Sequence, residues 1–130
     1  MNVDQLGNLY GTLRGYGKSS GAVFKLSPSK GITLFRFNGE DGAEPTAGLL
    51  MRQGTAYGLT GAGGASGYGV IFELNEKEET VLYNFCSEPN CVDGRYPSGG
   101  GSLVSAGVGL YGTSSSGGAY GQGVVFEITR

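Results

Sequence analysis

Residues 54–75 read GTAYGLTGAGGASGYGVIFELN: a tyrosine–glycine pair, a connection rich in glycine and serine, and an apolar run that contains phenylalanine. The same arrangement occurs at residues 7–27, GNLYGTLRGYGKSSGAVFKLS, and at residues 109–129, GLYGTSSSGGAYGQGVVFEIT. The phenylalanines of the three copies are Phe24, Phe72 and Phe126. Self-similarity at a period of about 50 residues predicts a chain of repeated structural units.

A second half-unit follows the first two copies. It reads ITLFRFNGEDGAEPTAGLL in one and TVLYNFCSEPNCVDGRYPSGGGSL in the other. Phe37 follows Phe24 by 13 residues, and Phe85 follows Phe72 by the same interval. We treat residues 1–130 as a single repeat domain. Its parts are repeat one at 7–53, repeat two at 54–106 and a half repeat at 107–130.

The apolar runs alternate with a period of two residues. In VIFELN, Phe72 and Leu74 fall on one face of an extended chain and Ile71 and Glu73 on the other. This alternation is typical of half-buried strands. Helix is disfavoured because glycine interrupts the chain nearly every ten residues, at about 1 kcal/mol each in a helix interior. The charged stretch at 75–79 is interpreted as the polar turn between the second and third strands.

Each full repeat then supplies four short strands. They are the Tyr-Gly-Thr run, the Val-Phe run, the Leu-Phe-x-Phe run, and Leu49–Leu50 or Leu103–Val104. A four-stranded antiparallel unit of this length is typical of a β-propeller blade. We predict an all-β fold of tandem four-stranded antiparallel meanders, β-propeller-like blades, with about two and a half per chain. A compact β-sandwich or barrel is the alternative.

The motifs LYGT, GVVFEI and VLYNFC....C.DG..P resemble the bacterial Gloeo/Verruco (GloVer) repeats. The resemblance covers nearly the whole chain, because the motifs recur in order. It implies a propeller-like fold and extracellular proteins with many repeats, and it implies no established biochemical activity. This chain departs from the usual pattern in its small number of repeats and in showing no export signal or anchor.

The number of strands implies exposed sheet edges. Ten strands make two and a half blades, whereas propellers close with at least four blades. Exposed strand edges invite pairing with another chain. We expect a homo-oligomer, in which two copies supply twenty strands to a five-bladed ring. The alternatives are a part of a longer propeller and a compact sandwich or barrel.

The two cysteines, Cys86 and Cys91, are separated by four residues. A turn that brings their Cα atoms within about 7 Å would close a small disulfide loop. Such a bond indicates an oxidising compartment. Two reduced thiols, or two ligands of an incomplete metal site, are the alternatives. A tetrahedral zinc site is disfavoured because the chain has no histidine and no further cysteine.

Charge and hydropathy exclude several partners. The formal net charge is −2, and no basic stripe exists to neutralise nucleic-acid phosphates. No apolar run approaches the roughly 20 residues of a membrane helix. The N-terminal residues lack the basic and apolar segments of a signal peptide. We still expect a secreted, cell-surface or periplasmic protein, because of the cysteine pair and the family resemblance.

No catalytic residue, metal site or cofactor is predicted. Without histidine, Ser–His and Cys–His constellations are impossible. Asp41 and Asp93 occupy equivalent repeat positions and are the one pair considered for glycoside hydrolysis. Asp-Gly followed by proline is better interpreted as turn chemistry. Glu40, Asp41 and Glu44 are likewise interpreted as a solvated acidic turn rather than a calcium site.

The tyrosines offer the candidate binding residues. Tyr16, Tyr68 and Tyr120 lie in the Gly/Ser-rich connections, where rigid amphipathic rings can contact a sugar or a protein surface. A second set opens each unit and is expected to pack between blades: Tyr10, Tyr57 and Tyr111. We therefore predict a non-enzymatic repeat module for binding or scaffolding, with carbohydrate or protein as the ligand. A purely structural self-assembling propeller segment is the alternative, and a glycoside hydrolase the remote one.

Overall fold

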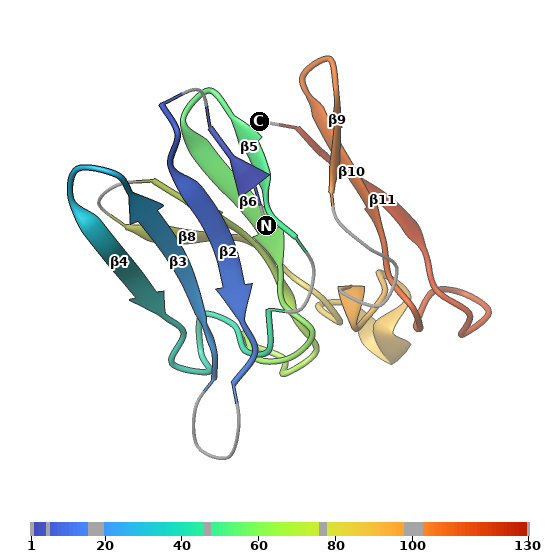
Figure 1. Ribbon diagram of the computed structural model, residues 1–130. Coiled ribbons are helices and arrows are strands. Elements are labelled where there is room, and N and C mark those ends of the chain that lie inside the picture. Colours follow the sequence, from blue (N-terminus) through green and yellow to red (C-terminus); the bar gives the residue numbers. More distant parts are fainter. Residues whose placement is uncertain are drawn as a thin grey trace.

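The computed structural model describes residues 2–4, 6–15, 20–45, 48–75, 78–97 and 103–129, and their strands form three antiparallel sheets that lie next to one another (Figure 1). The first sheet contains β1 (Asn2–Val3), β2 (Leu9–Leu13), β3 (Ala22–Ser27) and β4 (Gly31–Arg36). The second contains β5 (Leu50–Arg52), β6 (Thr55–Leu59), β7 (Val70–Leu74) and β8 (Glu79–Asn84). The third contains β9 (Val104–Ala106), β10 (Gly109–Thr113) and β11 (Val125–Thr129). The prediction of an all-β fold built from blade-like antiparallel units is confirmed.

The strands are grouped differently from the prediction. Leu50 and Val104 were expected in the last strand of one unit, but β5 and β9 are the first strands of the second and third sheets. The reason is local, because Gln53 and Gly54 both have positive φ, at 52° and 81°, and make a two-residue hairpin turn between Arg52 and Thr55. The described residues therefore contain eleven strands rather than ten, since β1 also pairs with β2. The repeat boundaries at 7–53, 54–106 and 107–130 stay predictions about sequence periodicity.

The charged stretch at 75–79 is only partly a turn. The backbone N–H of Asn75 donates to the carbonyl of Glu78, and the Glu78 N–H donates to Asn75 Oδ1. Glu79, however, is the first residue of β8 and pairs with Leu74.

The three phenylalanine anchors occupy equivalent places. Each stands in the third strand of its sheet's order and lies over a glycine of the strand before it. The pairs are Phe24 with Gly11, Phe72 with Gly58 and Phe126 with Gly112. Because a ring fills the space where a side chain would stand, the glycine of each Tyr-Gly pair is a packing requirement. The predicted equivalence of these positions is confirmed.

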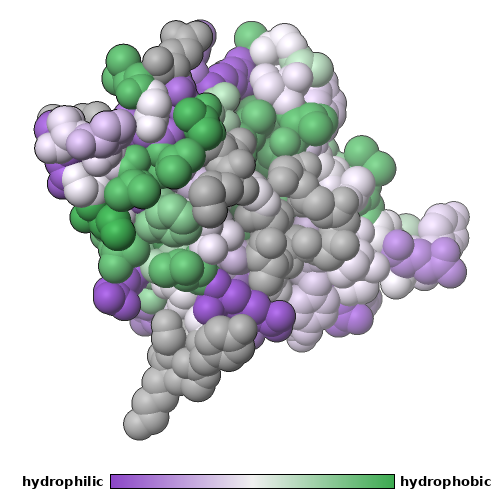
Figure 2. Space-filling view, in the orientation of Figure 1, coloured by the Kyte–Doolittle hydropathy of each residue, from purple (hydrophilic) through white to green (hydrophobic). Residues whose placement is uncertain are grey.

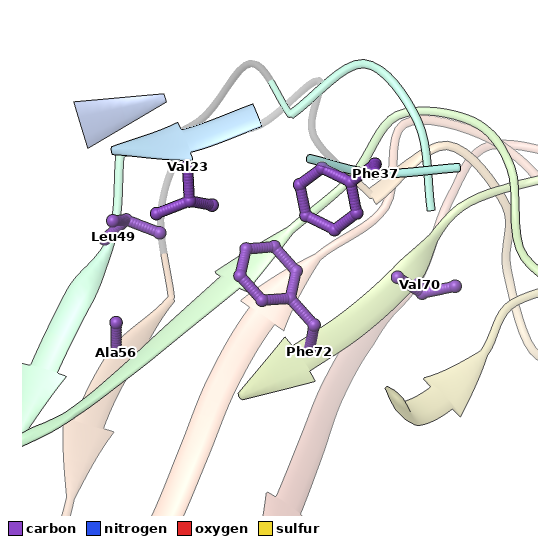
Figure 3. Close-up of a cluster of buried hydrophobic side chains, with 6 residues drawn as sticks. All are labelled: Val23, Phe37, Leu49, Ala56, Val70 and Phe72. Atoms are coloured by element: carbon purple, nitrogen blue, oxygen red, sulfur yellow. The ribbon is translucent and has the colours of Figure 1, made fainter. Parts of the chain in front are cut away.

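The hydrophobic core lies between the sheets in two layers. Val23 and Phe37, from the first sheet and the segment after it, pack against Ala56, Val70 and Phe72 of the second sheet (Figure 3). The Phe37 and Phe72 rings meet edge to face with centroids 5.1 Å apart. Between the second and third sheets the buried layer contains Tyr57, Leu59, Ile71, Phe85, Leu103 and Leu110. The sheets therefore stack face on face, with the second sheet covered on both sides.

The segments that follow β4 and β8 are held by backbone hydrogen bonds. Each bonds to the glycine-rich connection of its own sheet and to that of the next sheet. Phe37 N–H donates to the Gly21 carbonyl, and Phe85 N–H donates to the Gly69 carbonyl. Further along, Ala43 pairs with Ala62, and Arg95 pairs with Ser116. Repeated bonds of this kind give the loops the same regularity as the strands.

Candidate functional site

The outer face of the first sheet is apolar and uncovered by any described residue. Residues opposite each other in register share a face, so Val3, Leu9, Leu26 and Ile32 form one row, and Gly11, Phe24 and Leu34 the next. Ile32 is 67% exposed and Val3 62% exposed. Figure 2 shows hydrophobic side chains gathered over β2, β3 and β4 on this side of the molecule. We call this surface the phenylalanine face.

The corresponding face of the second sheet is covered by the first sheet. Met51, Ala56 and Leu74 stand where Val3, Leu9 and Leu26 stand in the first sheet. There the first sheet covers them, and Phe72 is fully buried. The phenylalanine face thus matches a packing surface of the second sheet, but no described residue covers it.

At the opposite end of the stack, the outer face of the third sheet is the side that carries the tyrosine rather than the phenylalanine. On the second sheet, the side that carries Tyr57 is covered by the third sheet. Its counterpart on the third sheet carries Val104, Tyr111 and Glu127 in one row and Val125 nearby, and no described residue covers it. The Tyr111 hydroxyl donates to Glu127 Oε2 at 2.5 Å, a bond that raises the pKa of the tyrosine. We call this surface the tyrosine face.

The tyrosines that open each unit therefore differ in their surroundings. Tyr10 packs against the core between the first and second sheets, where Lys25 Nζ lies 5.8 Å from its ring centroid. Tyr57 is buried between the second and third sheets. Both agree with the expected packing between blades, whereas Tyr111 stands on the uncovered tyrosine face.

Among the predicted loop tyrosines, the two that the structure describes, Tyr68 and Tyr120, have different surroundings. Tyr16 lies outside the described residues. Tyr120 is 93% exposed at the tip of its connection. Tyr68 instead meets Tyr96 edge to face, with centroids 5.4 Å apart, and the Arg95 guanidinium carbon lies 5.6 Å from the Tyr68 centroid and 5.8 Å from that of Tyr96. Two rings and a guanidinium from two neighbouring loops make a small patch suited to stacking on a sugar or a peptide.

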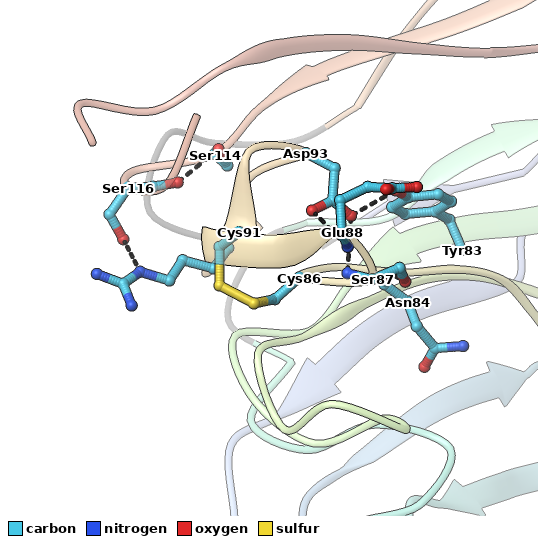
Figure 4. The surroundings of a disulfide bond; sticks show 10 residues. Tyr83, Asn84, Cys86, Ser87, Glu88, Cys91, Asp93, Ser114 and Ser116 are labelled. Carbon is cyan, nitrogen blue, oxygen red and sulfur yellow. Dashed lines mark hydrogen bonds between the residues drawn. A yellow bond between two sulfur atoms is a disulfide. The ribbon is translucent and has the colours of Figure 1, made fainter. Parts of the chain in front are cut away.

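Asp41 and Asp93 each serve their own turn. Asp41 Oδ1 accepts the Asn38 N–H at 2.8 Å. Asp93 accepts the backbone N–H groups of Ser87 and Glu88 and the hydroxyl of Tyr83 (Figure 4). The glycines that follow have positive φ, as the turn interpretation requires.

The hydrogen bonds at Asp93 change the pKa of both Asp93 and Tyr83. Burial alone would raise the pKa of Asp93, but the hydrogen bonds from Tyr83, Ser87 and Glu88 bring it below its ordinary value. Burial first, and then the bond to Asp93, raise the pKa of Tyr83 to about 12. Asp93 is therefore an anion that accepts several hydrogen bonds, which is the arrangement of a fixed structural turn.

Cys86 and Cys91 form a disulfide, as predicted (Figure 4). It closes the loop that contains η1 (Pro89–Cys91), a 3₁₀ turn. Both cysteines have positive φ, at 60° and 54°. The bond fixes the segment that is longer in the second repeat than in the first, next to the Asp93 turn.

Glu79 is the titratable group that the sequence did not single out. Burial first, and then the charge and hydrogen bonding of Asp41, raise its pKa to about 7. Its Oε2 atom is buried and lacks a hydrogen-bond partner among the described residues. The carboxyl group of Asp41, from the loop after the first sheet, and that of Glu79, from the second sheet, therefore interact.

Neither membrane helices nor clustered metal ligands occur in the described ranges. No helix there has the length and apolar character needed to cross a bilayer. Likewise, no group of three or more cysteine, aspartate or glutamate side chains is placed to hold a metal ion.

The repeat architecture agrees with the comparison to known families. A model of the Gloeobacter/Verrucomicrobia repeat matches residues 1–130. The chain belongs to this family. The Gloeobacter/Verrucomicrobia resemblance seen in the motifs is therefore confirmed over the whole length. Neither the curated proteins nor the solved structures contain a significant match.

Within this Gloeobacter/Verrucomicrobia repeat chain, sequence reasoning missed Arg95 and Tyr96. The signal was present in the comparison of the two full repeats, because Ala43 and Glu44 occupy the same places before the buried proline. A change from small and acidic to basic and aromatic at equivalent loop positions distinguishes the second repeat.

Proposed function

We propose that this chain is a non-enzymatic scaffolding module of propeller-like design, which assembles with further copies by stacking its sheets. One observation carries the proposal: the phenylalanine face and the tyrosine face are the two surfaces that meet at both internal sheet interfaces, and in the part of the chain that the structure describes each is also left uncovered at one end of the stack. A contact between the phenylalanine face of one copy and the tyrosine face of another repeats an interface that the chain already makes twice.

Such a contact is heterologous, since it joins two different surfaces. Heterologous contacts form closed rings or continue as filaments. Each copy contributes three sheets, so a ring of two copies has six rather than the five expected from strand number. Burying Ile32, Leu34 and Leu26 would supply much of the driving force, at about 25 cal/mol per Å² of apolar area.

Mixing two blocked variants tests the proposal. Ile32→Asp places a charge on the phenylalanine face, and Val104→Asp places one on the tyrosine face. Each variant alone should have the 13.4 kDa mass of a monomer by light scattering, and an equimolar mixture should form a heterodimer through the two intact faces. Wild type should associate as its concentration rises.

Val92→Asp is the matched control, because Val92 is exposed on a loop and lies on neither face. It should associate like wild type. Association of either blocked variant alone, or a mixture that stays monomeric, would contradict head-to-tail stacking.

The patch of Tyr68, Arg95 and Tyr96 supports a second function, recognition of a carbohydrate or protein surface. It lies in the loops rather than on the stacking faces, so assembly leaves it accessible. Tyr96→Ala should abolish any binding found on a glycan array or a peptide panel, while Tyr120→Ala tests the isolated exposed ring. Unchanged binding by Tyr96→Ala would exclude this patch.

The disulfide supports an extracytoplasmic location, because such bonds persist in oxidising compartments. The turn roles of Asp41 and Asp93 support the non-enzymatic proposal, since each carboxylate already serves its own loop.

A further inference from the structure

The outer edge of β11 pairs with no strand in the described part of the chain. The first two sheets have a fourth strand at this place, β4 beside β3 and β8 beside β7. In the third sheet, β11 pairs with β10 and with no second strand among the described residues. Backbone N–H and C=O groups along such an edge are available to an added strand.

A cavity lies beside this edge. It has a volume of about 370 Å³ and lies along the junction of the second sheet with β11, where the Phe85 and Phe126 rings meet edge to face with centroids 5.1 Å apart. Ile71, Tyr83 and Phe85 line one side, and Phe126 and Ile128 line the other. An open edge and a cavity lined mostly by apolar side chains therefore coincide, and each is a separate observation.

The second sheet shows what fills the equivalent space. There β8 sets Glu79 beside Leu74 and Val81 beside Phe72. Val81 packs into the core against the first sheet. Leu74 corresponds to Ile128 and Phe72 to Phe126, so a strand added to β11 would set one side chain beside each of these two residues.

Charge specifies one position of the added strand. Asp41 interacts with Glu79 of β8 across the first interface. Asp93, the equivalent of Asp41, lines the cavity, as does Glu127, and the residues that line it include no lysine or arginine. A basic side chain at the position equivalent to Glu79 would meet Asp93.

We propose that β11 and this cavity form an acceptor site for one extended peptide segment, which adds antiparallel to β11 as the fourth strand of the third sheet. Two side chains of the segment, two residues apart, lie on the same face of the added strand. One is apolar and lies beside Phe126, and the other is basic and lies beside Ile128 and Asp93. Main-chain hydrogen bonds supply affinity, and the alternate side chains supply specificity.

The test uses two fluorescent peptides that carry a solubilising tail. One has the sequence of residues 78–85, EETVLYNF, and the other has the same sequence with Glu79→Lys. Both should bind in fluorescence anisotropy, and the lysine peptide should bind about tenfold more tightly at low salt. That advantage should shrink as salt screens the contact with Asp93. Amide hydrogen exchange should show new protection at residues 125–129.

Two protein variants distinguish peptide binding at this site from nonspecific binding. Val92→Asp adds a charge at an exposed residue that lines the cavity and should weaken binding of the EETVLYNF peptide by about tenfold. Val108→Asp, an exposed valine in the turn between β9 and β10, should bind as wild type does. Ile32→Asp should also bind normally, so that failure of sheet stacking and failure of strand addition are distinguishable.

Three results would overturn the proposal. They are equal binding by Val92→Asp and wild type, peptide-induced protection that lies outside β11, and protection of β11 before any peptide is added. The last result would mean that the edge is already occupied by a second copy.

Discussion

Phe72 covers Gly58 so closely that a Cβ atom at position 58 would stand 2.5 Å from Cζ of the phenylalanine ring. The same approach recurs at 2.5 Å between Phe24 and Gly11 and at 2.6 Å between Phe126 and Gly112. A glycine under an aromatic ring in every sheet explains why the Tyr-Gly and Phe motifs recur together in the sequence.

Replacing that glycine should be costly. Gly58→Ala places a methyl group against Phe72 and 2.9 Å from Leu49 Cδ2, so the core must shift. We expect a loss of about 1–3 kcal/mol in the free energy of unfolding, as for other overpacked cores. Urea denaturation monitored by tyrosine fluorescence measures it.

A double-mutant cycle shows whether the ring is the cause. Phe72→Leu destabilises the protein by itself, but it also removes the ring that the methyl group meets. Gly58→Ala should therefore cost much less in the Phe72→Leu background than in wild type. Additive losses would mean that the ring and the glycine are not coupled.

Because the pKa of Glu79 is raised, we predict that the free energy of unfolding falls as pH rises. Its pKa is about 7 in the folded protein against 4.5 as the ordinary value, so folding favours the protonated form. The contribution is fully present below pH 4.5 and is lost as pH rises through about 7. With screening by solvent at this half-exposed site, the change is about 1 kcal/mol.

Glu79→Gln should remove that dependence, because glutamine resembles the protonated acid. The variant should be more stable than wild type at pH 8 and should show a flatter stability profile between pH 4.5 and 7. Glu78→Gln, at the exposed neighbouring position, should keep the wild-type slope. An identical slope in Glu79→Gln would show that Glu79 does not titrate in this range.

The disulfide should stabilise the long loop of the second repeat. Closing a loop of this size removes conformational freedom from the unfolded chain and contributes about 2 kcal/mol. The double variant Cys86→Ser with Cys91→Ser should lose that amount in urea denaturation. Reductant should destabilise wild type by a similar amount and leave the double variant unchanged. A reductant effect on the double variant would assign the loss to something other than this bond.

Asp93 should control both loop stability and Tyr83. Asp93→Asn weakens three hydrogen bonds and should cost about 1–3 kcal/mol. The pKa of Tyr83 should fall below about 12, which NMR titration of labelled tyrosine measures. Asp41→Asn is the control, since Phe35 occupies the place of Tyr83 in the first sheet. A Tyr83 pKa that stays at about 12 in Asp93→Asn would contradict this coupling.

Much of the fold could be predicted because the same strand-forming pattern recurs in each repeat of the sequence. The period-two runs at Phe24, Phe72 and Phe126 became strands, and the cysteine pair became a disulfide. The assignment of Leu50 and Val104 to the preceding unit was wrong because strand grouping depends on turn geometry. Gln53 at positive φ is not visible as a turn former in the sequence.

The candidate sites were less predictable, because they depend on which faces meet. Tyr111 and Tyr57 have the same sequence context, yet only Tyr57 is buried between two sheets. The pKa of Glu79 depends on Asp41, which lies 38 positions earlier and on another sheet's loop. Spacing along the chain contains no information on either contact.

A nitroxide label at Val108→Cys tests the central claim, that the tyrosine face of one copy meets the phenylalanine face of another. The nitroxide-labelled variant, at natural isotope abundance, is mixed with ¹³C-methyl-labelled wild type. Paramagnetic broadening of the wild-type methyl signals is then measured by NMR. We predict broadening of Leu9, Leu26 and Ile32, the row nearest the turns of the first sheet. Broadening confined to other methyl groups, or none at concentrations where the protein associates, would contradict the account.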